Sequence, residues 1–383
     1  MAEKSELVEG SWSDEQDSDI SYNWVTRMND IQLIEQGINI LEFTDKISKR
    51  NPDMEFRLIR RITETQYHNE QLKDYEPKLN KLNRYNNILP YKRTEVKLED
   101  ESDEECPYIN ASFINSVHKG NGERKFIATQ GPLPETFNQF WKMVWSENVQ
   151  CIMMLCNLRE NDKVQCDQYW PSGVGVTQQY GKLSVTYEEE EIHFNSLYKR
   201  KMTLTKEKHN ESRVIYQYQW SEWKDHGIPD ENSINIIDEL IDIMLQEYQQ
   251  NRKSIVHCSA GVGRTGTLIS LVNLVLNLRH HLPTIKNAVM QGITNFHENE
   301  QLKKCTISIF GIVRRLREQR WGMVHHSEQY GYLYKYMKII IERELQKIGA
   351  SQLTSESQDG QSSFTLSVNT TKKQDGENKV QQD

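Results

Sequence analysis

The segment Ser254–Gly266, SIVHCSAGVGRTG, constrains the fold of this 383-residue chain more than any other stretch. Its first four residues suit a short buried strand, and the apolar run at 267–280 predicts a long helix. Gly261 and Gly263 allow the connection between them to curl until its backbone N–H groups point inward. The sequence therefore predicts an α/β domain with an anion-binding loop at a strand–helix junction.

The side chains of this loop indicate phosphoryl transfer. Cys258 opens the loop, where the helix N-terminus and a nearby cation favour the nucleophilic thiolate without a separate base. Arg264 follows six residues later, and its planar guanidinium can hold two phosphate oxygens while the transition state forms. Thr265 can donate a hydrogen bond to the sulfur and help it leave. An inert buried cysteine in a glycine-containing turn is the competing interpretation, and the complete pattern argues against it.

The rest of the central region reads as alternating strands and helices. Short segments rich in β-branched and aromatic residues predict strands at 126–128, 151–155, 183–187, 202–204, 214–220 and 254–257. Helical periodicity predicts helices at 234–248, 267–280, 306–319 and 328–345. The sequence contains no internal repeat.

Composition divides the chain into three parts. Hydrophobic residues make up 36% of the sequence, below the roughly 45–50% of compact domains, so polar tails are expected around an ordinary core. Residues 1–51 are expected to form an acidic, partly disordered extension with a possible helix, residues 52–347 a single α/β domain, and residues 348–383 a disordered polar tail. The acidic insert at 99–105 is expected to be a solvated loop.

Residues 31–50 carry isoleucines and leucines at roughly helical spacing and predict an amphipathic helix. Such a helix either docks on the domain or binds a partner. We favour docking, because most amphipathic helices bury one face against a core.

Charge and cysteine content exclude several protein classes. The net charge of −8 argues against a general nucleic-acid binder. Six cysteines without a recurring spacing predict neither a disulfide framework nor a zinc site, and a reducing compartment is expected. The N-terminus lacks the apolar stretch of a secretory signal, and no apolar run is long enough to cross a bilayer. We therefore expect a cytoplasmic protein.

The segment HCSAGVGRTG matches the signature loop of the tyrosine-specific protein tyrosine phosphatases at every position, and the chain resembles the non-receptor members with a single catalytic domain. The resemblance covers about residues 52–345 and includes six further motifs and an EQY sequence at 328–330. The motifs are NRYNNILPY (83–91), YINASFI (108–114), TQGPLPETFNQFWKMVW (129–145), CDQYWP (166–171), WKDHGIP (223–229) and GIVRRLREQRWGMV (311–324). The resemblance implies a highly twisted mixed central sheet flanked by helices.

The resemblance also implies roles for residues outside the loop. Asp225 would be the general acid on a mobile loop and would later activate water. Gln329 would help to place that water, and Glu160 would pair with Arg264. His257 is expected to be structural and electrostatic, tuning Cys258 without moving protons.

The implied substrate is phosphotyrosine in proteins or peptides. Tyr85 would wall a pocket too deep for phosphoserine to reach the thiolate, and Asn87 stands where the family has an acidic residue that holds the peptide backbone. The phosphate itself would be bound by the loop residues Ser259, Ala260, Gly261, Val262 and Gly263. No metal or cofactor is expected, because the thiolate and the arginine supply what a metal supplies in other phosphatases. We expect a monomer.

Three departures from the family pattern leave alternatives open. Lys224 replaces a proline, Gln165 stands where lysine is common, and His325 replaces a glutamine that contacts substrate or water. The rate and pH dependence of loop closure and the breakdown of the phosphoenzyme therefore remain open. One alternative is a phosphotyrosine-binding pseudophosphatase with little or no turnover. A dual-specificity or lipid phosphatase is the other, and it would lack the NRY wall and the ordered motif series.

Overall fold

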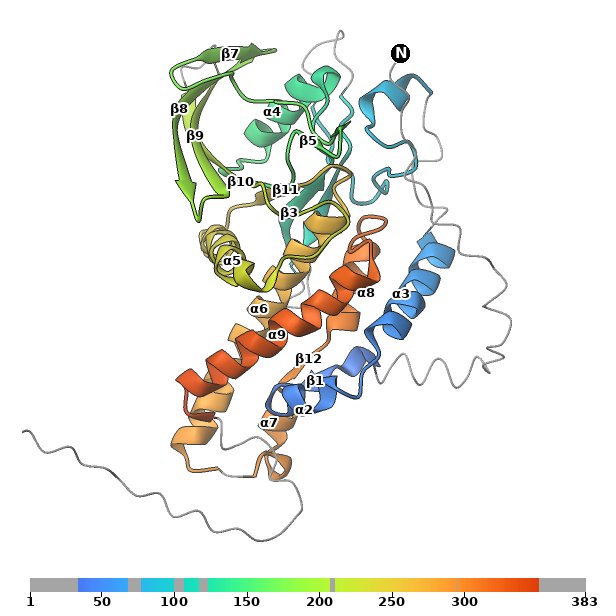
Figure 1. Ribbon diagram of the computed structural model, residues 1–383, viewed down its shortest axis with the longest axis vertical. Helices are drawn as coiled ribbons and strands as arrows, with labels where there is room; N and C mark the ends of the chain where they lie inside the picture. The colour runs from blue at the N-terminus through green and yellow to red at the C-terminus, as the bar shows by residue number, and fades with distance from the viewer. Residues whose placement is uncertain are drawn as a thin grey trace, which may run out of the picture.

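The computed structural model describes residues 34–67, 77–99, 107–116, 123–206, 211–293 and 295–350. Its centre is an eight-stranded sheet in the order β2-β3-β11-β4-β10-β9-β8-β7. Strands β3, β11, β4 and β10 run parallel to their neighbours in this group, and the remaining pairs are antiparallel. The sheet is mixed and strongly twisted, with helices beside it (Figure 1). The fold class expected from the sequence is confirmed.

The strands of the main sheet are β2 (Ala111–Asn115), β3 (Arg124–Thr129), β4 (Cys151–Met154), β7 (Thr177–Tyr180), β8 (Leu183–His193), β9 (Leu197–Lys206), β10 (Glu211–Trp220) and β11 (Ser254–His257). Two small sheets pair β1 (Ile38–Asn39) with β12 (Thr306–Ile307) and β5 (Arg159–Glu160) with β6 (Lys163–Val164). All four residues of β11 are buried between parallel neighbours, which suits the two apolar residues at its centre, Ile255 and Val256.

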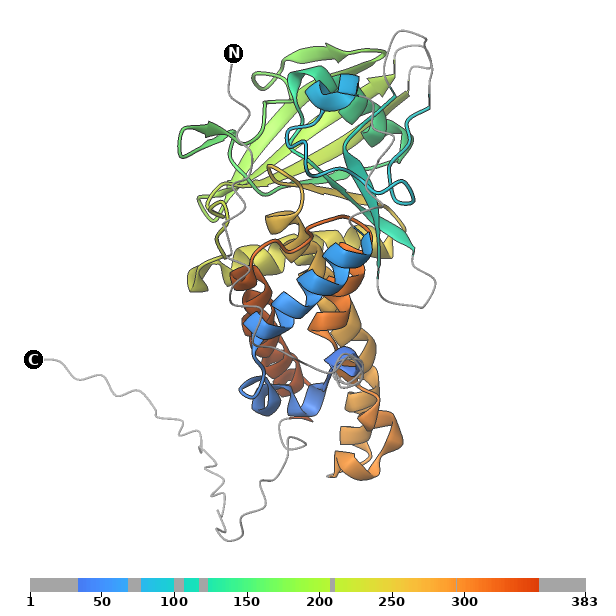
Figure 2. The ribbon, with the colours of Figure 1, turned by 90° about the vertical axis from the view of Figure 1, so that its right-hand side faces the viewer.

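The α-helices are α2 (Phe43–Ile47), α3 (Pro52–Tyr67), α4 (Phe137–Ser146), α5 (Ile234–Gln249), α6 (Gly263–Met290), α7 (Glu300–Lys303), α8 (Ile309–Arg317) and α9 (Ser327–Lys347). Short 3₁₀ helices are η2 (Ile40–Glu42), η3 (Pro77–Leu82), η4 (Pro134–Thr136), η6 (Glu231–Ser233) and η7 (Phe296–Glu298). Helix α4 packs against β7 and β8, whereas α5 and α6 pack against β3, β4 and β11. Helices α3, α8 and α9 complete a helical layer around α6 (Figure 2).

Two predicted helices have different ends in the structure. Helix α6 begins at Gly263 and continues past Pro283 to Met290, well beyond the expected end at residue 280. The segment expected as a helix at 306–319 starts instead with strand β12, and α8 begins only at Ile309. The reason is local: the hydroxyl of Ser308 accepts a hydrogen bond from the Gly311 N–H (3.0 Å) and caps the helix there.

The single helix predicted at 31–50 is wrong for the part that the structure describes. Gly37 has a positive φ of 80°, and the chain then forms β1, η2 and α2 in place of a continuous helix. Asn39 stabilises this break, since its side chain accepts from the Leu41 N–H (2.9 Å) and donates to the Leu302 carbonyl (2.8 Å). The apolar side chains Ile40 and Phe43 are buried in the main core, so the segment does dock on the domain.

The described residues add three facts to the sequence analysis. Within the described ranges no helix combines the length and apolar character of a membrane span. No cluster of three potential metal ligands is found in the same ranges. The five cysteines that the structure describes are unpaired thiols and are buried. Residues 348–350 belong to the described part, most of the acidic insert and the rest of the predicted tail lie outside it, and the predicted domain boundaries stay predictions.

We expect Gly37→Ala to destabilise the protein by about 1–3 kcal/mol, because a left-handed backbone is strained for alanine. A Cβ at this position would also lie 2.4 Å from the Ile307 carbonyl oxygen. The matched control is Gly331→Ala in α9, where the nearest atom to the new Cβ is 4.0 Å away and the better helix former should raise stability. Urea denaturation measures both, and a Gly37→Ala variant as stable as wild type would contradict the account.

Candidate active site

The loop that joins β11 to α6 forms a cradle from Cys258 to Arg264, here called the cradle loop. Gly261 has a φ of 72°, and a Cβ there would lie 2.1 Å from the Thr129 carbonyl oxygen, so only glycine fits. Gly263 has no positive φ and is instead the first residue of α6. The close contact of Gly261 with the end of β3 therefore fixes how tightly the loop curls.

The carbonyl groups of the cradle loop are bound from its outer side. The Ser259 carbonyl accepts from the Gly131 N–H (2.8 Å), and those of Ala260 and Gly261 accept from Arg320 (3.1 and 2.9 Å). Within the described part of the chain, the backbone N–H groups of Ser259 and Gly261 donate to no protein group. Because the carbonyls face outward, these donors face the interior of the curl, where an anion can accept them.

Arg264 is fixed inside the site, with 1% of its surface exposed. Its Nη1 donates to both oxygens of Glu160 (2.8 and 3.1 Å) and to the Trp223 carbonyl (2.8 Å), and its Nη2 contacts Asp225 Oδ1 at 3.0 Å. Burial alone lowers the pKa of Arg264, but the nearby Cys258, Glu160 and Asp225 raise it above the usual value. Among the described residues its buried Nε–H has no partner, so this donor is available to a ligand.

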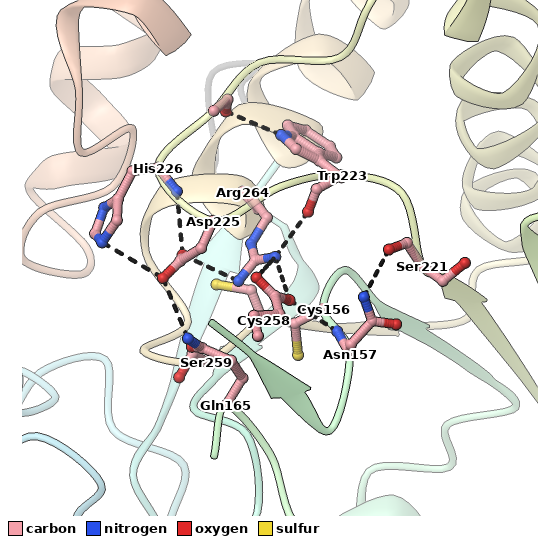
Figure 3. Close-up of polar contacts among 12 residues, drawn as sticks. Cys156, Asn157, Gln165, Ser221, Trp223, Asp225, His226, Cys258, Ser259 and Arg264 are labelled. Atoms are coloured by element: carbon pink, nitrogen blue, oxygen red, sulfur yellow. Dashed lines mark hydrogen bonds and ion pairs between the residues drawn. The ribbon is translucent and has the colours of Figure 1, made fainter. Parts of the chain in front are cut away.

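Cys258 lies beside this guanidinium at the base of the site (Figure 3). Behind it, burial lowers the pKa of His257 to about 4, so the imidazole is neutral. Its Nδ1 donates to the Cys258 carbonyl (3.1 Å) and its Nε2 accepts from the Tyr169 hydroxyl (2.8 Å). The ring thus stiffens the start of the cradle loop. Among the described residues the buried hydroxyl of Thr265 has no hydrogen-bond partner, so the bond expected from it to the sulfur is not formed in this structure.

The segment 223–229 closes over the cradle loop. A tight turn shapes it, in which the Gly227 N–H donates to the Lys224 carbonyl (3.1 Å) and the Trp223 indole donates to the Gly227 carbonyl (3.1 Å). This turn directs Asp225 to Arg264, and Gln165 Nε2 lies 3.4 Å from the second carboxylate oxygen, Oδ2 (Figure 3). A lysine in place of the family's proline is therefore compatible with a closed 223–229 loop.

Apolar and aromatic groups lie beside the cradle loop, at the entrance to the site. Tyr85 and Trp321 pack around a small cluster made by Ile88, Ala260 and Val262. Burial raises the pKa of Tyr85, whose hydroxyl is 2.9 Å from the Ser259 hydroxyl. The turn that carries Tyr85 is anchored by Gln130, whose side chain accepts from the Arg84 N–H (2.9 Å) and donates to the Leu82 carbonyl (2.9 Å).

Asn87 is exposed on the turn that carries Tyr85. Within the described residues its side chain makes no hydrogen bond, so the structure does not join it to the cradle loop. Its predicted contact with a peptide backbone stays a prediction.

The first turn of α9 links the 223–229 loop to the cradle loop. Gln329 Oε1 accepts from the N–H groups of His325 (3.1 Å) and His326 (3.3 Å), and its Nε2 is 3.4 Å from the Gly227 carbonyl. A Cβ on Gly263 would lie 3.2 Å from the same Nε2, so Gln329 also borders the cradle. Burial lowers the pKa of His325 to about 3, which keeps that ring neutral. The structure therefore brings both predicted residues to the site.

Four contributors to this site are not predicted by the sequence. They are Arg320 behind the cradle loop, the Trp223 carbonyl on Arg264, His226, and His326 at the start of α9. Arg320 belongs to the motif at 311–324, but three other arginines share that motif and nothing in the spacing distinguishes them. His226 follows Asp225 and His326 follows His325, two residues that the sequence does predict for the site. Only the fold shows that the side chains of His226 and His326 meet.

Comparisons with known proteins agree with this geometry. Residues 79–338 match the family described as protein-tyrosine phosphatase. The mouse receptor-type tyrosine-protein phosphatase eta is 34% identical over 263 residues, covering 68% of this chain and 19% of that protein. The human tyrosine-protein phosphatase non-receptor type 4 is 34% identical over 252 residues, covering 66% of this chain and 24% of that protein. The chain thus spans about a fifth to a quarter of these relatives.

Solved structures show the same fold. The catalytic domain of the human non-receptor type 18 phosphatase superposes with a TM-score of 0.64 at 27% identity, covering 79% of this chain and 99% of that one. PTPN18 has also been solved with HER2 phosphopeptides, with a TM-score of 0.62 and 27% identity over 78% of this chain and 97% of that one. The family match extends over more than half of the chain and contains the cradle loop, Asp225 and Gln329. The chain belongs to the protein-tyrosine phosphatase family.

Proposed function

We propose that this protein hydrolyses phosphotyrosine in proteins through a phosphate covalently bound to Cys258. The observation that carries the proposal is the arrangement at Arg264, whose guanidinium contacts Asp225 through Nη2 and has Cys258 on the same side (Figure 3), while its buried Nε–H has no partner among the described residues. A nucleophile, an anion site and a proton donor thus converge on one point. Family membership and the phosphopeptide complexes of PTPN18 support the same reaction.

The first step transfers the phosphoryl group to the enzyme. The Cys258 thiolate attacks phosphorus, the bond from phosphorus to the tyrosine oxygen breaks, and the protonated Asp225 gives its proton to that oxygen. The Arg264 guanidinium and the inward N–H groups of the cradle loop bind the phosphate oxygens as their charge shifts. Gln165 is placed to donate to Asp225 Oδ2 without adding a positive charge, so it orients the acid and leaves it free to hold a proton.

The second step releases inorganic phosphate. A water attacks the phosphorus of the cysteinyl-phosphate, Asp225 now accepts a proton from that water, and the sulfur leaves as a thiolate. Gln329, which contacts both the 223–229 loop and the start of α9, is positioned to hold the water. The buried Thr265 hydroxyl has no competing partner, which leaves it available to the leaving sulfur.

The entrance favours an aromatic phosphate ester. Tyr85 and Trp321 border an apolar cluster above the cradle loop, and a phenyl ring gains from packing against such groups. A serine side chain is too short to reach past this wall. The cytoplasmic location and the monomeric state expected from the sequence stay predictions.

The pseudophosphatase alternative rests on Lys224, His325 and Gln165. In the structure these residues lie around Asp225 and the start of α9, and Arg264 is held by Glu160, Trp223 and Asp225. We therefore favour a protein that hydrolyses phosphotyrosine over one that only binds it.

We expect wild type to hydrolyse a phosphotyrosine peptide and to leave the matching phosphoserine peptide intact. Cys258→Ser should abolish turnover, because the hydroxyl is not ionised at neutral pH. Asp225→Ala should lower kcat by about 10²–10⁴-fold, since the leaving tyrosine oxygen must then depart unprotonated. Release of inorganic phosphate measures all three proteins. Binding of the phosphotyrosine peptide by wild type without turnover would establish the pseudophosphatase.

We expect Gln165→Lys to move the alkaline limb of the kcat–pH profile to lower pH. A cation 3–4 Å from a carboxylate stabilises its ionised form, so the acid loses its proton earlier as pH rises. Gln165→Met, of similar size and without charge, is the matched control and should leave the limb in place. Identical alkaline limbs for the two variants would mean that residue 165 does not act on Asp225.

A further inference from the structure

A pair of histidines joins the 223–229 loop to the start of α9. His226 Nδ1 lies 2.6 Å from His326 Nε2, and the two rings meet edge to face with centroids 4.7 Å apart. His226 also lies beside the acid Asp225. Its backbone N–H donates to Asp225 Oδ1 (3.1 Å), and its ring Nε2 is 3.4 Å from Asp225 Oδ2 (Figure 3). Residue 226 has a positive φ of 59°, so its backbone is held in an unusual conformation at this contact.

We propose that this pair, the histidine clasp, positions Asp225 by holding the 223–229 loop closed, and that protonation of both imidazoles opens it. The inference rests on the proposed phosphatase reaction, because it assigns His226 and His326 as positioning residues for the acid of that reaction. Neither residue needs to touch the substrate.

The protonation states of the two imidazoles determine whether the hydrogen bond of the clasp can form. Two imidazole nitrogens 2.6 Å apart share one proton, with one ring donating and the other accepting. This holds when both rings are neutral and becomes stronger when one ring is protonated, since the bond is then charge-assisted. When both rings are protonated, two N–H groups and two positive charges face each other. The bond is then replaced by repulsion.

The charges around His326 determine the pH at which this happens. His226 and Asp225 face it from the 223–229 loop, Glu328 from α9, and Arg60 from α3, while the His325 ring lies 4.9 Å away. Burial, His226 and Arg60 lower the pKa of His326, and the two carboxylates oppose them. Closure lowers this pKa, so the closed loop holds the proton less tightly than the open loop does. The closed loop is therefore favoured at pH values above the ordinary pKa of histidine and is lost as the pH falls below that pKa.

A second contact holds the same loop without titrating. Gln329 Nε2 reaches the Gly227 carbonyl, but at 3.4 Å this bond is at the long limit, whereas the clasp is short. His326 is also the residue before α9, and Gln329 binds its N–H. The clasp therefore joins the acid to a rigid helix end through one side-chain bond.

The test compares His326→Gln with His326→Ala in the full chain. Glutamine places an amide near the Nε2 position and can bond His226 at any pH, whereas alanine removes the bond. His297→Gln is the matched control, because this exposed histidine lies on η7, which packs against α7. In Figure 1 α7 lies at the end of the helical layer away from the sheet. The readout is kcat between about pH 5 and pH 8, the range in which histidines titrate. Substrates are a phosphotyrosine peptide and para-nitrophenyl phosphate, whose leaving group needs little protonation.

We expect His326→Ala to lower kcat on the phosphotyrosine peptide by about 3- to 10-fold at neutral pH, the effect of losing one hydrogen bond. The loss on para-nitrophenyl phosphate should be smaller, because that reaction depends less on Asp225. His326→Gln should keep the wild-type kcat at neutral pH and retain it to lower pH than wild type does. The His297→Gln profile should match wild type.

Two outcomes would overturn the clasp. Wild-type profiles for His326→Ala on both substrates would show that the bond does not hold the loop. Equal losses for the alanine and glutamine variants on both substrates would show a structural role for His326 alone.

A measurement without turnover separates this inference from the proposed function. Fluorine NMR of protein labelled with 5-fluorotryptophan, with the Trp223 signal assigned by Trp223→Phe, reports the state of the 223–229 loop directly. We expect the wild-type signal to shift as pH falls, the glutamine variant to resist the shift, and the alanine variant to be open throughout. An inactive wild type with this pH-dependent shift would overturn the phosphatase reaction and keep the clasp. An active enzyme without the shift would overturn the clasp alone.

Discussion

The buried guanidinium of Arg264 is the group on which the rest of the site depends. A cation with 1% of its surface exposed is stable only when its donors are paired, and the two carboxylates and one carbonyl around it come from two separate segments. Glu160 belongs to β5, whereas Trp223 and Asp225 belong to the 223–229 loop. Satisfying one charge thus draws the acid, its loop and the cradle loop together, and the buried Nε–H, which has no partner among the described residues, is available to a substrate.

A second buried arginine acts from the opposite side. Arg320 binds the outward carbonyls of Ala260 and Gly261, and burial lowers its pKa to about 10, so it remains charged at neutral pH. In a peptide unit the C=O and the N–H that follows it point in opposite directions. A carbonyl that faces Arg320 outside the cradle loop therefore turns the next N–H toward the interior of the loop. The positive field of the cradle loop is therefore produced by the orientation of its peptide units, and a glycine at 261 permits that orientation where Thr129 comes close.

The departures from the family pattern share a location. Lys224, Gln165 and His325 lie around Asp225 and the start of α9, and none is in the cradle loop. The histidine clasp lies in the same region. The cradle loop thus follows the family pattern in full, while the departures from that pattern gather around Asp225, where we propose that the clasp acts.

The sequence by itself determined the local chemistry. The order of residues from Ser254 to Gly266 is enough to predict a strand, a turn that only glycine allows and a helix end that attracts anions, because all three depend on neighbouring residues. It also predicted six of the eight strands of the main sheet and helices α5, α6, α8 and α9 approximately, but not helices α3 and α4. It did not predict the break at Gly37 or the extent of α6, which depend on contacts with β12 and with the helical layer. Tertiary structure alone decided which carboxylates meet Arg264, which arginine braces the cradle loop, and that His226 meets His326 from 100 residues away. Contacts between distant segments leave no local spacing in the sequence, and they are fixed only when burial forces charged and polar groups to find partners.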